Sequence, residues 1–393
     1  MRKKKRVAIL GATGSIGKNA LDILRAGKND FEPVLFSGYR DVPGLLALAK
    51  EYPAAALALS GGDCGSSDCA DLARAGACFG REGLLRSIAE CGADIAVNAI
   101  AGAAGLEPSL AALEAGADLA LANKETIVMA GELVFALAKR KQARIIPVDS
   151  EHSAVFSLLE AHGRDQTAEI LLTASGGPFR KKPQEELERI TPKEALNHPT
   201  WNMGPKITID SATLANKGLE VIEAAKLFDM DTERIKVVVH PQSIVHSMVR
   251  LRDGAVYAQL SRPDMRLPIH NALYYPEVTP QPFGHLDFDS LTLEFEKPDY
   301  GRFPMLALAY EASRGGGMYP AVYNAANEAA VSAFTENRAG FSDIPRIVSF
   351  VLQDDWNSGT AFSGADSAET LRAILETDRL AREKAEKFIL EMI

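Results

Sequence analysis

Up to about residue 150, the chain alternates between short apolar segments and longer segments with helical periodicity. Strands that alternate with helices form parallel sheets, because each helix returns the chain to the edge at which the previous strand began. We therefore predict an α/β fold with a doubly wound parallel sheet for this part of the chain. The expected strands lie near residues 6–11, 33–37, 55–60, 94–100, 118–122 and 143–148.

A glycine-rich turn follows the first expected strand. Residues 11–17 read GATGSIG, and a helix is expected from this turn to about Ala26. Glycines in such a turn let the backbone approach a pyrophosphate, whose charge then lies at the helix N-terminus. The spacing is G-x-x-G-x-x-G rather than the commoner G-x-G-x-x-G. We interpret the segment as a dinucleotide-binding turn, with a purely structural turn as the alternative.

Arg40 stands just after the second expected strand, where NAD-binding chains usually carry an acidic residue against the ribose hydroxyls. A cation at this place suits the 2′-phosphate of NADPH, so the sequence favours NADPH over NADH. The next residue, Asp41, argues in the opposite direction. An exposed loop arginine without a ligand is the structural alternative.

The composition disfavours several functional classes. A chain of 393 residues is long enough for two or three domains, each with its own core. The net charge of -9 disfavours general nucleic-acid binding. No segment offers the roughly 18 consecutive apolar residues of a membrane span. Cys64, Cys69, Cys78 and Cys91 form no C-x-x-C pair, which favours reduced thiols in a cytoplasmic protein.

The pattern changes after residue 150. Further strands are expected at 168–174 and 205–209, and a hairpin at 244–251 and 255–260, turned at Asp253-Gly254. Amphipathic helices are expected at 305–313, 323–335, 344–353 and 368–392. We therefore expect four parts: a cofactor-binding domain at 1–149, an α+β domain at 150–275, a proline-rich linker at 276–304, and a helical bundle at 305–393.

Two carboxylates, Asp149 and Glu151, stand one residue apart where an apolar strand gives way to a helix. Oxygen ligands of this kind suit Mg²⁺ or Mn²⁺, and Mg²⁺ usually takes only one or two protein carboxylates. Asp149 or Ser150 could instead merely cap the following helix. A third acid is needed for a convincing site, and Glu220 is the candidate.

Glu220 belongs to an expected helix at 211–228. Helical spacing assigns the buried face of this helix to Leu214, Gly218, Val221, Ala225 and Phe228. Glu220 falls on the opposite side together with Asn216 and Glu223. On an isolated helix that side would face water, so the spacing alone leaves open whether Glu220 is a ligand.

Two further segments have the composition of binding loops. Residues 173–178 (TASGGP) end an apolar strand with a hydroxyl and two glycines, where backbone N–H groups can meet an anion. Residues 198–205 (HPTWNMGP) contain breakers of regular structure and two large side chains, Trp201 and Met203, which could form a lid over substrate. Both side chains could equally fill the core from a loop.

The chain resembles the 1-deoxy-D-xylulose 5-phosphate reductoisomerase family in an ordered set of motifs along nearly its whole length. The motifs are GATGSIG at 11–17, ANKE at 122–125, PVDSEHS at 147–153, LTASGG at 172–177, HPTWNMG at 198–204, DSAT at 210–213, NKGLE at 216–220 and NAANE at 324–328. Two departures are Ala12, where many members have serine, and Ser37-Gly38-Tyr39-Arg40, in place of Gly-Lys-Asn or Gly-Arg-Asn. The second leaves the detailed 2′-phosphate contacts open.

The resemblance implies a cytoplasmic homodimer of non-mevalonate isoprenoid biosynthesis, with a Rossmann-like N-terminal domain and a catalytic and dimerisation domain at 150–275. Such an enzyme uses NADPH and a divalent cation (Mg²⁺, Mn²⁺ or Co²⁺) to rearrange and reduce 1-deoxy-D-xylulose 5-phosphate, giving 2-C-methyl-D-erythritol 4-phosphate. The implied metal ligands are Asp149, Glu151 and Glu220, which form the catalytic group with Lys124. The implied substrate contacts are Lys124, Ser150, Glu151, Ser175, His198, Trp201, Ser211, Asn216, Lys217 and Glu220. The implied cofactor contacts are Thr13, Gly14, Ser15, Ile16, Gly38, Arg40, Asn123, Glu125, Met203 and Gly204.

Two rival functions are compatible with parts of the sequence. A plain NADP-dependent dehydrogenase of a phosphorylated carbonyl substrate would explain the glycine turn, but not three acids and a phosphate clamp. A non-catalytic dinucleotide sensor would bind NADPH without turnover. A steady-state assay with substrate and Mg²⁺ distinguishes all three functions.

Overall fold

The structure is a computed structural model that describes residues 3–61, 69–201, 203–357 and 367–392. The chain forms two compact units. Unit 1 contains Met1–Asn123, Val134–Ser153 and Asp264–Gly284, and unit 2 contains Lys124–Leu133, Ala154–Pro263 and His285–Ile393. The four-part division drawn from the sequence stays a prediction. Cys64 lies outside the described residues, and so does Asn202, which belongs to the expected lid at 198–205.

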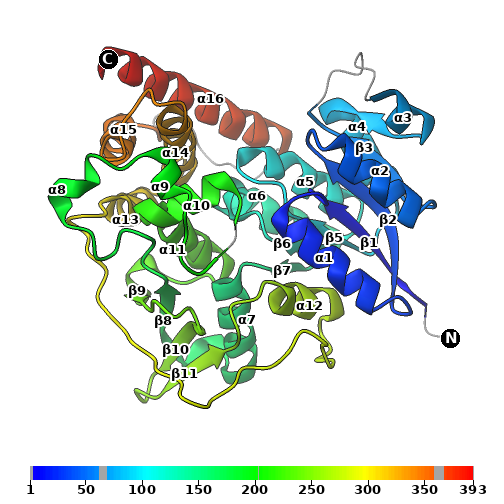
Figure 1. Cartoon of the computed structure of the whole chain (residues 1–393), viewed down its shortest axis with the longest axis horizontal. Helices are drawn as coiled ribbons and strands as arrows, with labels where there is room; N and C mark the ends of the chain where they lie inside the picture. Colours follow the sequence, from blue (N-terminus) through cyan, green and yellow to red (C-terminus); the bar gives the residue numbers. More distant parts are fainter. Residues whose placement is uncertain (1–2, 62–68, 202, 358–366, 393) are drawn as a thin grey trace. The chain divides into compact units, whose positions relative to one another are not determined.

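Unit 1 is built on a parallel sheet of seven strands in the order β4-β3-β2-β1-β5-β6-β7 (Figure 1). The strands are β1 (Lys5–Leu10), β2 (Phe31–Gly38), β3 (Ala56–Leu59), β4 (Cys78–Phe79), β5 (Ile95–Asn98), β6 (Asp118–Leu121) and β7 (Ile145–Pro147). The doubly wound sheet is confirmed, and β4 is the strand that the sequence missed. Because β2 and β5 lie on opposite sides of β1, the strand order reverses there, and ligands bind such sheets outside the carboxyl ends of the strands at this point.

Helices cover this sheet and supply its core. They are α1 (Ser15–Ala26), α2 (Val42–Glu51), α3 (Cys69–Arg74), α4 (Gly80–Glu90), the short η1 (Ala103–Gly105), α5 (Leu106–Glu114) and α12 (Arg266–Tyr274). The sequence did not predict α12, which packs against α1. Its Tyr274 hydroxyl donates to the Asp30 carboxylate at 2.7 Å. Cys78 and Cys91 are free thiols, as predicted.

Two helices contribute residues to both units. α6 (Lys124–Lys141) is kinked at Ala130, whose φ of -140° and ψ of 27° are not helical. Its first ten residues, Lys124–Leu133, belong to unit 2 and the rest to unit 1. α7 (Ser150–His162) begins in unit 1 and continues from Ala154 in unit 2. Among the described residues, no helix combines the length and apolar character that a membrane span requires.

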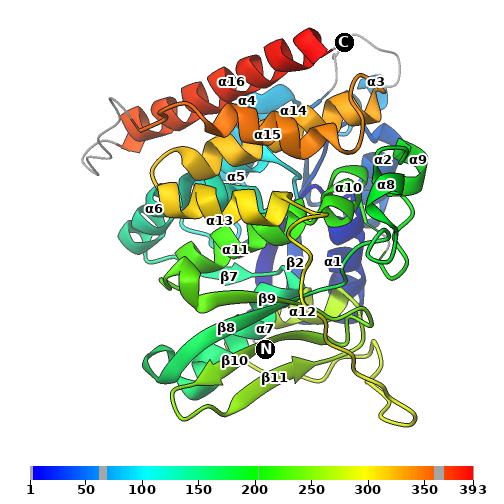
Figure 2. The same ribbon diagram turned by 90° about the vertical axis from the view of Figure 1, so that its left-hand side faces the viewer.

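Unit 2 contains a four-stranded mixed sheet in the order β11-β10-β8-β9 (Figure 2). The strands are β8 (Thr167–Ala174), β9 (Ile235–Val239), β10 (Val245–Leu251) and β11 (Val256–Leu260). The β10–β11 hairpin confirms the prediction, whereas β9 was missed. The predicted strand at 205–209 is wrong, because these residues open the helix α10 (Pro205–Thr213). Pro205 occupies the first turn of α10, where a missing N–H is harmless.

The helix expected at 211–228 is also corrected. Leu214 has a left-handed φ of 63° and separates α10 from α11 (Ala215–Leu227). α11 is buried on nearly all sides, and Glu220 and Glu223 are each only 1% exposed. A Cβ at Gly218 would lie 2.7 Å from the Cβ of Ala309, so the glycine allows close packing of neighbouring helices against α11. The acids of α11 therefore face protein rather than water.

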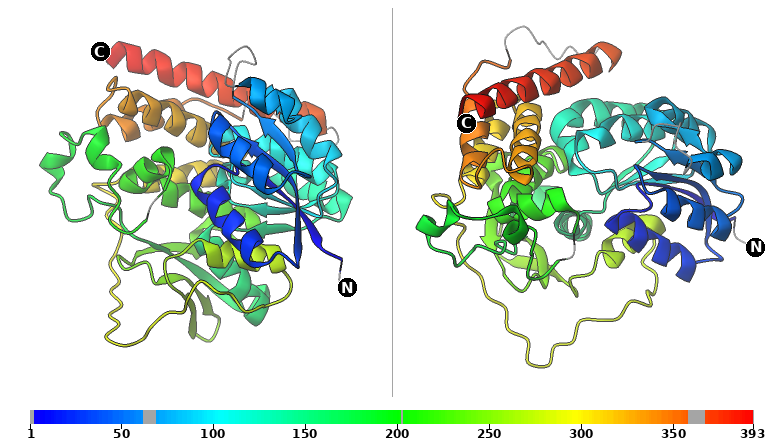
Figure 3. Two further views of the ribbon diagram at one scale, coloured as in Figure 1. Left: turned by 45° about the vertical axis from the view of Figure 1, so that its right-hand side comes forward. Right: turned by 45° about the horizontal axis from the view of Figure 1, so that its top comes forward.

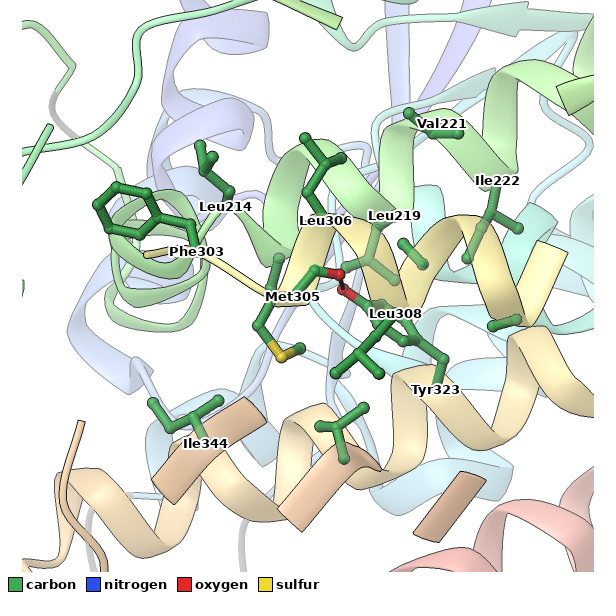
Figure 4. Packing of buried hydrophobic residues seen from close by; sticks show 14 of the residues in the cluster. Leu214, Leu219, Val221, Ile222, Phe303, Met305, Leu306, Leu308, Tyr323 and Ile344 are labelled. Carbon is green, nitrogen blue, oxygen red and sulfur yellow. Dashed lines mark hydrogen bonds between the residues drawn. The ribbon is translucent and has the colours of Figure 1, made fainter. Parts of the chain in front are cut away.

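The four predicted C-terminal helices are confirmed as α13 (Met305–Gly315), α14 (Tyr319–Thr335), α15 (Asp343–Leu352) and α16 (Ser367–Met392). Helix α14 packs against α13, α15 and α16 (Figure 3). Leu219 and Ile222 of α11 meet this bundle in one apolar cluster (Figure 4). Within the cluster, the Tyr323 hydroxyl donates to the Met305 carbonyl at 3.0 Å. The remaining helical turns are η2 (Arg164–Gln166), α8 (Gln184–Leu187), α9 (Pro192–Ala195) and η3 (Thr232–Arg234).

Candidate active site

The glycine turn of unit 1 lies at the carboxyl end of β1, at the point where the strand order reverses. Gly11 has a left-handed φ of 85°, and a Cβ there would lie 2.9 Å from the Ala99 carbonyl oxygen beyond β5. Gly17 touches the turn so closely that its Cβ would lie 2.6 Å from the Ala12 Cα. Gly14 precedes α1 and provides no side-chain cap. The backbone N–H groups at the start of α1 are thus suited to an anion.

Asn123 fixes the loop after β5, the strand that pairs with β1 on the side away from β2. Its side-chain amide donates to the carbonyl oxygens of Ile100 at 2.7 Å and Gly102 at 2.8 Å. Asn98 holds the other end of this loop by donating to the Gly105 carbonyl at 2.8 Å. The predicted cofactor residue Asn123 is therefore 2% exposed and acts on the shape of the loop.

Arg40 and Asp41 follow β2 and have different environments. Asp41 caps α2, because its carboxylate accepts the Gly44 N–H at 2.9 Å. Arg40 is exposed, donates from Nε to the Gly61 carbonyl at 3.0 Å, and lies 4.8 Å from the Tyr39 ring centroid. The structure thus gives Asp41 a local structural role and leaves the cation of Arg40 at the surface. The predicted cofactor residue Gly38 lies nearby, where a Cβ would be 3.4 Å from the Thr13 hydroxyl.

Asp149, Ser150 and Glu151 stand where β7 leads into α7, in unit 1, and all three are half-buried. One oxygen of Asp149 accepts the Glu151 N–H at 3.3 Å and contacts His152 Nδ1 at 3.1 Å. Ser150 donates its hydroxyl to the Glu151 carboxylate. The capping contact that the sequence allowed is therefore present. It is long, and it uses a single oxygen of Asp149.

Glu220 lies in unit 2 among buried cations. Its Oε1 accepts from Lys124 Nζ at 3.0 Å and from the Asn216 amide at 2.6 Å. Its Oε2 accepts from Lys217 Nζ. The side chains of Lys124 and Lys217 are each 4% exposed. α6 and α11 thus bring four predicted site residues into one polar cluster, in which two ammonium groups face one carboxylate.

The predicted anion loop follows β8 in unit 2. Gly176 and Gly177 have left-handed φ values of 82° and 70°. A Cβ at Gly177 would lie 2.6 Å from the Ser211 carbonyl oxygen, so only glycine allows α10 to approach the loop this closely. Ser175, just before the glycines, lies with its hydroxyl 3.1 Å from His198 Nε2. The structure therefore brings Ser175, His198 and the α10 residue Ser211 into one region of unit 2.

The protonation of His198 follows from its partners. Nδ1 accepts the backbone N–H groups of Thr200 at 3.1 Å and Trp201 at 3.0 Å, so this nitrogen carries no proton. In the neutral ring the proton is therefore on Nε2, which donates to the Ser175 hydroxyl. Burial lowers the pKa of His198 below its usual 6.5, which favours this neutral form. His198 thereby joins the loop at 198–201 to the end of β8.

Trp201 and Met203 are half-buried, which argues against the alternative that they fill the core. The Trp201 ring lies 6.3 Å, centroid to centroid, from the ring of His246 on β10. Burial lowers the pKa of His246 to about 4, so this ring is neutral near pH 7. Sequence reasoning assigned no role to His246, to the half-buried Lys206 or to the buried Asp210 on α10. Only the i, i+4 spacing of Lys206 and Asp210 signalled that they could pair.

Family models match most of the chain. The model described as 1-deoxy-D-xylulose 5-phosphate reductoisomerase matches residues 7–131, the model of its C-terminal domain matches 145–228, and a model described as DXP reductoisomerase C-terminal domain matches 260–384. A 1-deoxy-D-xylulose 5-phosphate reductoisomerase of Chlorobium chlorochromatii is 47% identical over 98% of this chain and 100% of its own length. That of Chlorobaculum tepidum is 48% identical, with the same coverage of both chains.

Solved structures give the same result at the level of the fold. A DOX-P reductoisomerase in complex with NADPH, fosmidomycin and magnesium matches with a TM-score of 0.93 and 40% identity, covering 99% of both chains. The Zymomonas mobilis enzyme in complex with NADPH matches with a TM-score of 0.87 and 40% identity, covering 98% of this chain and 99% of its own.

Proposed function

Because this chain belongs to the 1-deoxy-D-xylulose 5-phosphate reductoisomerase family, we propose that it converts 1-deoxy-D-xylulose 5-phosphate to 2-C-methyl-D-erythritol 4-phosphate with NADPH and a divalent cation. The observation that carries the proposal is the polar cluster around Glu220, in a chain that matches NADPH- and magnesium-bound relatives over nearly its full length. Buried lysines and an acid on α6 and α11 are the groups that such a reaction requires to bind and orient a charged, oxygen-rich substrate.

Asp149, Glu151 and Glu220 are the proposed metal ligands. All three offer carboxylate oxygens, the donor type that Mg²⁺ and Mn²⁺ prefer. A bound cation would polarise neighbouring carbonyl and hydroxyl oxygens of the substrate. The position of Asp149 and Glu151 supports this assignment, because both half-buried carboxylates stand one residue apart where β7 leads into α7. Lys124 and Ser150 are proposed to contact the oxygenated carbons of the substrate.

The proposed phosphate clamp lies in unit 2. Its members are Ser175, His198, Ser211, Asn216 and Lys217. His198 donates to Ser175 and thereby orients a hydroxyl that can in turn donate to a phosphate oxygen. Binding of this remote phosphate would contribute free energy for orientation of the reacting carbons. Trp201 belongs to the segment proposed to close over the substrate.

Acidification should weaken substrate binding through His198. Burial lowers the pKa of His198 in the described loop, so His198 binds a proton more tightly when the loop opens. The neutral ring therefore stabilises the described loop conformation, and this contribution is complete above about pH 6.5. This contribution is lost as the pH falls below that value toward the lower folded pKa. We expect the KM for the phosphorylated substrate to rise in this window, measured in steady state from about pH 5 to 8.

A His198→Gln variant provides the control for this pH dependence. Its amide does not titrate, so only the substrate's own phosphate, with a second pKa of about 6, should affect its KM. Identical pH profiles for the variant and the wild-type protein would show that His198 does not cause the effect.

NADPH is proposed to bind unit 1 at the glycine turn and supplies the hydride for reduction of the rearranged aldehyde. The cofactor contacts proposed in unit 1 are Thr13, Gly14, Ser15, Ile16, Gly38, Arg40 and Asn123. Those proposed in unit 2 are Glu125, Met203 and Gly204. We also propose that the protein is a cytoplasmic homodimer, as the family resemblance implies.

Replacing Arg40 by Ala should weaken NADPH binding more than NADH binding. The exposed guanidinium offers charge-assisted hydrogen bonds to a 2′-phosphate, which NADH lacks. Hydrogen bonds to charged groups contribute about 1.5–3 kcal/mol, so the Kd ratio of the two cofactors should shift at least ~10-fold in a fluorescence titration. Arg25→Ala, at an exposed ion pair with Glu51, is the matched control in unit 1. Equal losses for both cofactors would assign Arg40 a structural role.

One assay separates the proposed function from its rivals. NADPH oxidation should require both 1-deoxy-D-xylulose 5-phosphate and Mg²⁺, and the product should carry the rearranged carbon skeleton by NMR. Oxidation that continues after complete chelation of the metal would favour a plain dehydrogenase. NADPH binding without turnover under all these conditions would favour a sensor.

A further inference from the structure

Lys206, in the first turn of α10, lies between carboxylates from two helices. Its Nζ donates to Glu125 Oε1 on α6 at 2.6 Å and lies 2.9 Å from Asp210 Oδ2 on its own helix. Burial disfavours the charge of Lys206, but Asp210 and Glu125 outweigh it and raise its pKa. Burial likewise opposes ionisation of Glu125, yet Lys206 holds the pKa of this acid below its usual value. Lys206 and Glu125 are therefore both charged, and α6 is joined to α10 by an ionic bridge.

Asn327 of α14 holds the other oxygen of Asp210. Its amide Nδ2 donates to Asp210 Oδ1 at 2.8 Å, and Asn327 is fully buried. The reverse orientation would point the Asn327 carbonyl at a carboxylate, so the charge of Asp210 selects the observed one. Asp210 is thereby held from two directions. The motif at 324–328, which has no part in the proposed substrate site, contacts the helix that carries Ser211.

Lys124 is the residue next to Glu125, at the start of α6. Its Nζ must stay near Asn216 Oδ1 at 2.9 Å and Glu220 Oε1 at 3.0 Å. A long lysine stem alone does not fix an ammonium group, since it has several rotatable bonds. The ionic bridge at Glu125 fixes the backbone from which this stem starts.

We propose that Lys206 is a positioning residue, which through Glu125 and Asp210 holds the first turn of α6 so that Lys124 stays directed at Glu220, while Asn327 fixes Asp210. This inference rests on the proposed function, because it assigns Lys124 to the reacting part of the substrate. Through Asn327 on α14, residues of the C-terminal helical bundle also contribute to the position of Lys124.

The first test is Lys206→Met, which keeps the apolar stem and removes the charge. Two buried carboxylates then repel each other, and the first turn of α6 moves away from its place. We expect kcat to fall about 10- to 100-fold, the range for groups that orient a catalytic residue, while Lys206→Arg recovers most of it. In a Lys124→Ala background, Lys206→Met should cause no further loss, because the group that it positions is gone. Losses that multiply in the double variant would overturn the proposal.

Two further variants keep the test independent of folding problems. Asn327→Leu acts at the far end of the network and should show a smaller loss with the same dependence on Lys124. Lys182→Met, at the surface pair with Glu186, removes a lysine from unit 2 and should leave kcat unchanged. An equal loss in Lys182→Met would overturn the proposal, since the effect would not be specific to the network.

A readout without turnover separates this inference from the proposed function. Lys124 is 4% exposed, so acylation of its amine, followed by mass spectrometry, should be slow in the wild-type protein and faster in Lys206→Met. Lys384, ion-paired with Asp354 and 21% exposed, is the internal control and should react equally in both. An inactive wild-type protein would refute the proposed function, whereas unchanged labelling of Lys124 would refute the positioning role.

Discussion

Replacing Glu220 by Gln should lower kcat/KM for the phosphorylated substrate at least ~100-fold, while NADPH affinity stays nearly unchanged. The carboxylate is 1% exposed and faces the ammonium groups of Lys124 and Lys217, so water cannot replace its charge. A neutral amide would also be a poor metal ligand. Asp149→Asn should act in the same direction for the second reason alone.

Turnover is measured as NADPH oxidation over a range of Mg²⁺ concentrations, and NADPH affinity by titration. Breaking a buried charge pair typically destabilises a protein by about 3–5 kcal/mol. The activity of Glu220→Gln is therefore measured well below the unfolding temperature of this variant. Glu186→Gln, at an exposed pair, is the matched control and should retain full activity. Full activity of either Glu220→Gln or Asp149→Asn would remove that residue from the metal site.

A single short ligand with a hydroxamate and a phosphonate should bind tightly and lose affinity when either anchor is removed. The hydroxamate offers two adjacent oxygens to the cation, and the phosphonate suits the proposed phosphate clamp, which includes Ser175 and Lys217. Lys217 is 4% exposed, so its charge acts with little screening by water. Lys217→Ala should therefore weaken binding by about 2–5 kcal/mol, or at least ~30-fold, in calorimetric titration.

Removal of the metal should weaken the same ligand independently of Lys217, because chelation and anion binding engage opposite ends of it. Lys226→Ala, on the same helix and bound through Nζ to the Val128 carbonyl, is a control for the loss of a lysine from α11. Binding that survives complete metal removal at full strength would contradict chelation by the proposed acids.

Most strands of the sheet in unit 1 were predicted from the sequence, because a parallel α/β fold produces a local alternation of apolar strands and amphipathic helices along the chain. The sequence missed β4, which has only two residues and so has no periodicity to detect. It also assigned residues 205–209 to a strand, since Ile207 and Ile209 alternate with polar residues. Pro205 and Gly204 were the stronger signals, and they mark the start of α10.

The candidate site was predictable where its residues are neighbours in the chain. Asp149 and Glu151 stand one residue apart, and Asn216 and Glu220 one helical turn apart, so their spacing shows that they can act together. The contact of Lys206 with Glu125 joins residues 81 positions apart, and that of Asn327 with Asp210 joins residues 117 apart. Such pairs exist only after the chain has folded, and no local pattern encodes them. The burial of Glu220 is of the same kind, because it depends on helices that pack around α11.

The cap that Asp41 forms on α2 limits how the cofactor preference of this chain can change during evolution or engineering. An acid adjacent to the surface arginine is already present, yet its carboxylate accepts the Gly44 N–H and is needed where it is. Loss of the contact proposed between Arg40 and the 2′-phosphate would therefore weaken NADPH binding without strengthening NADH binding. We therefore expect a switch to NADH to require a second, new acid, and a single substitution of Arg40 by an uncharged residue to give a protein that binds both cofactors poorly.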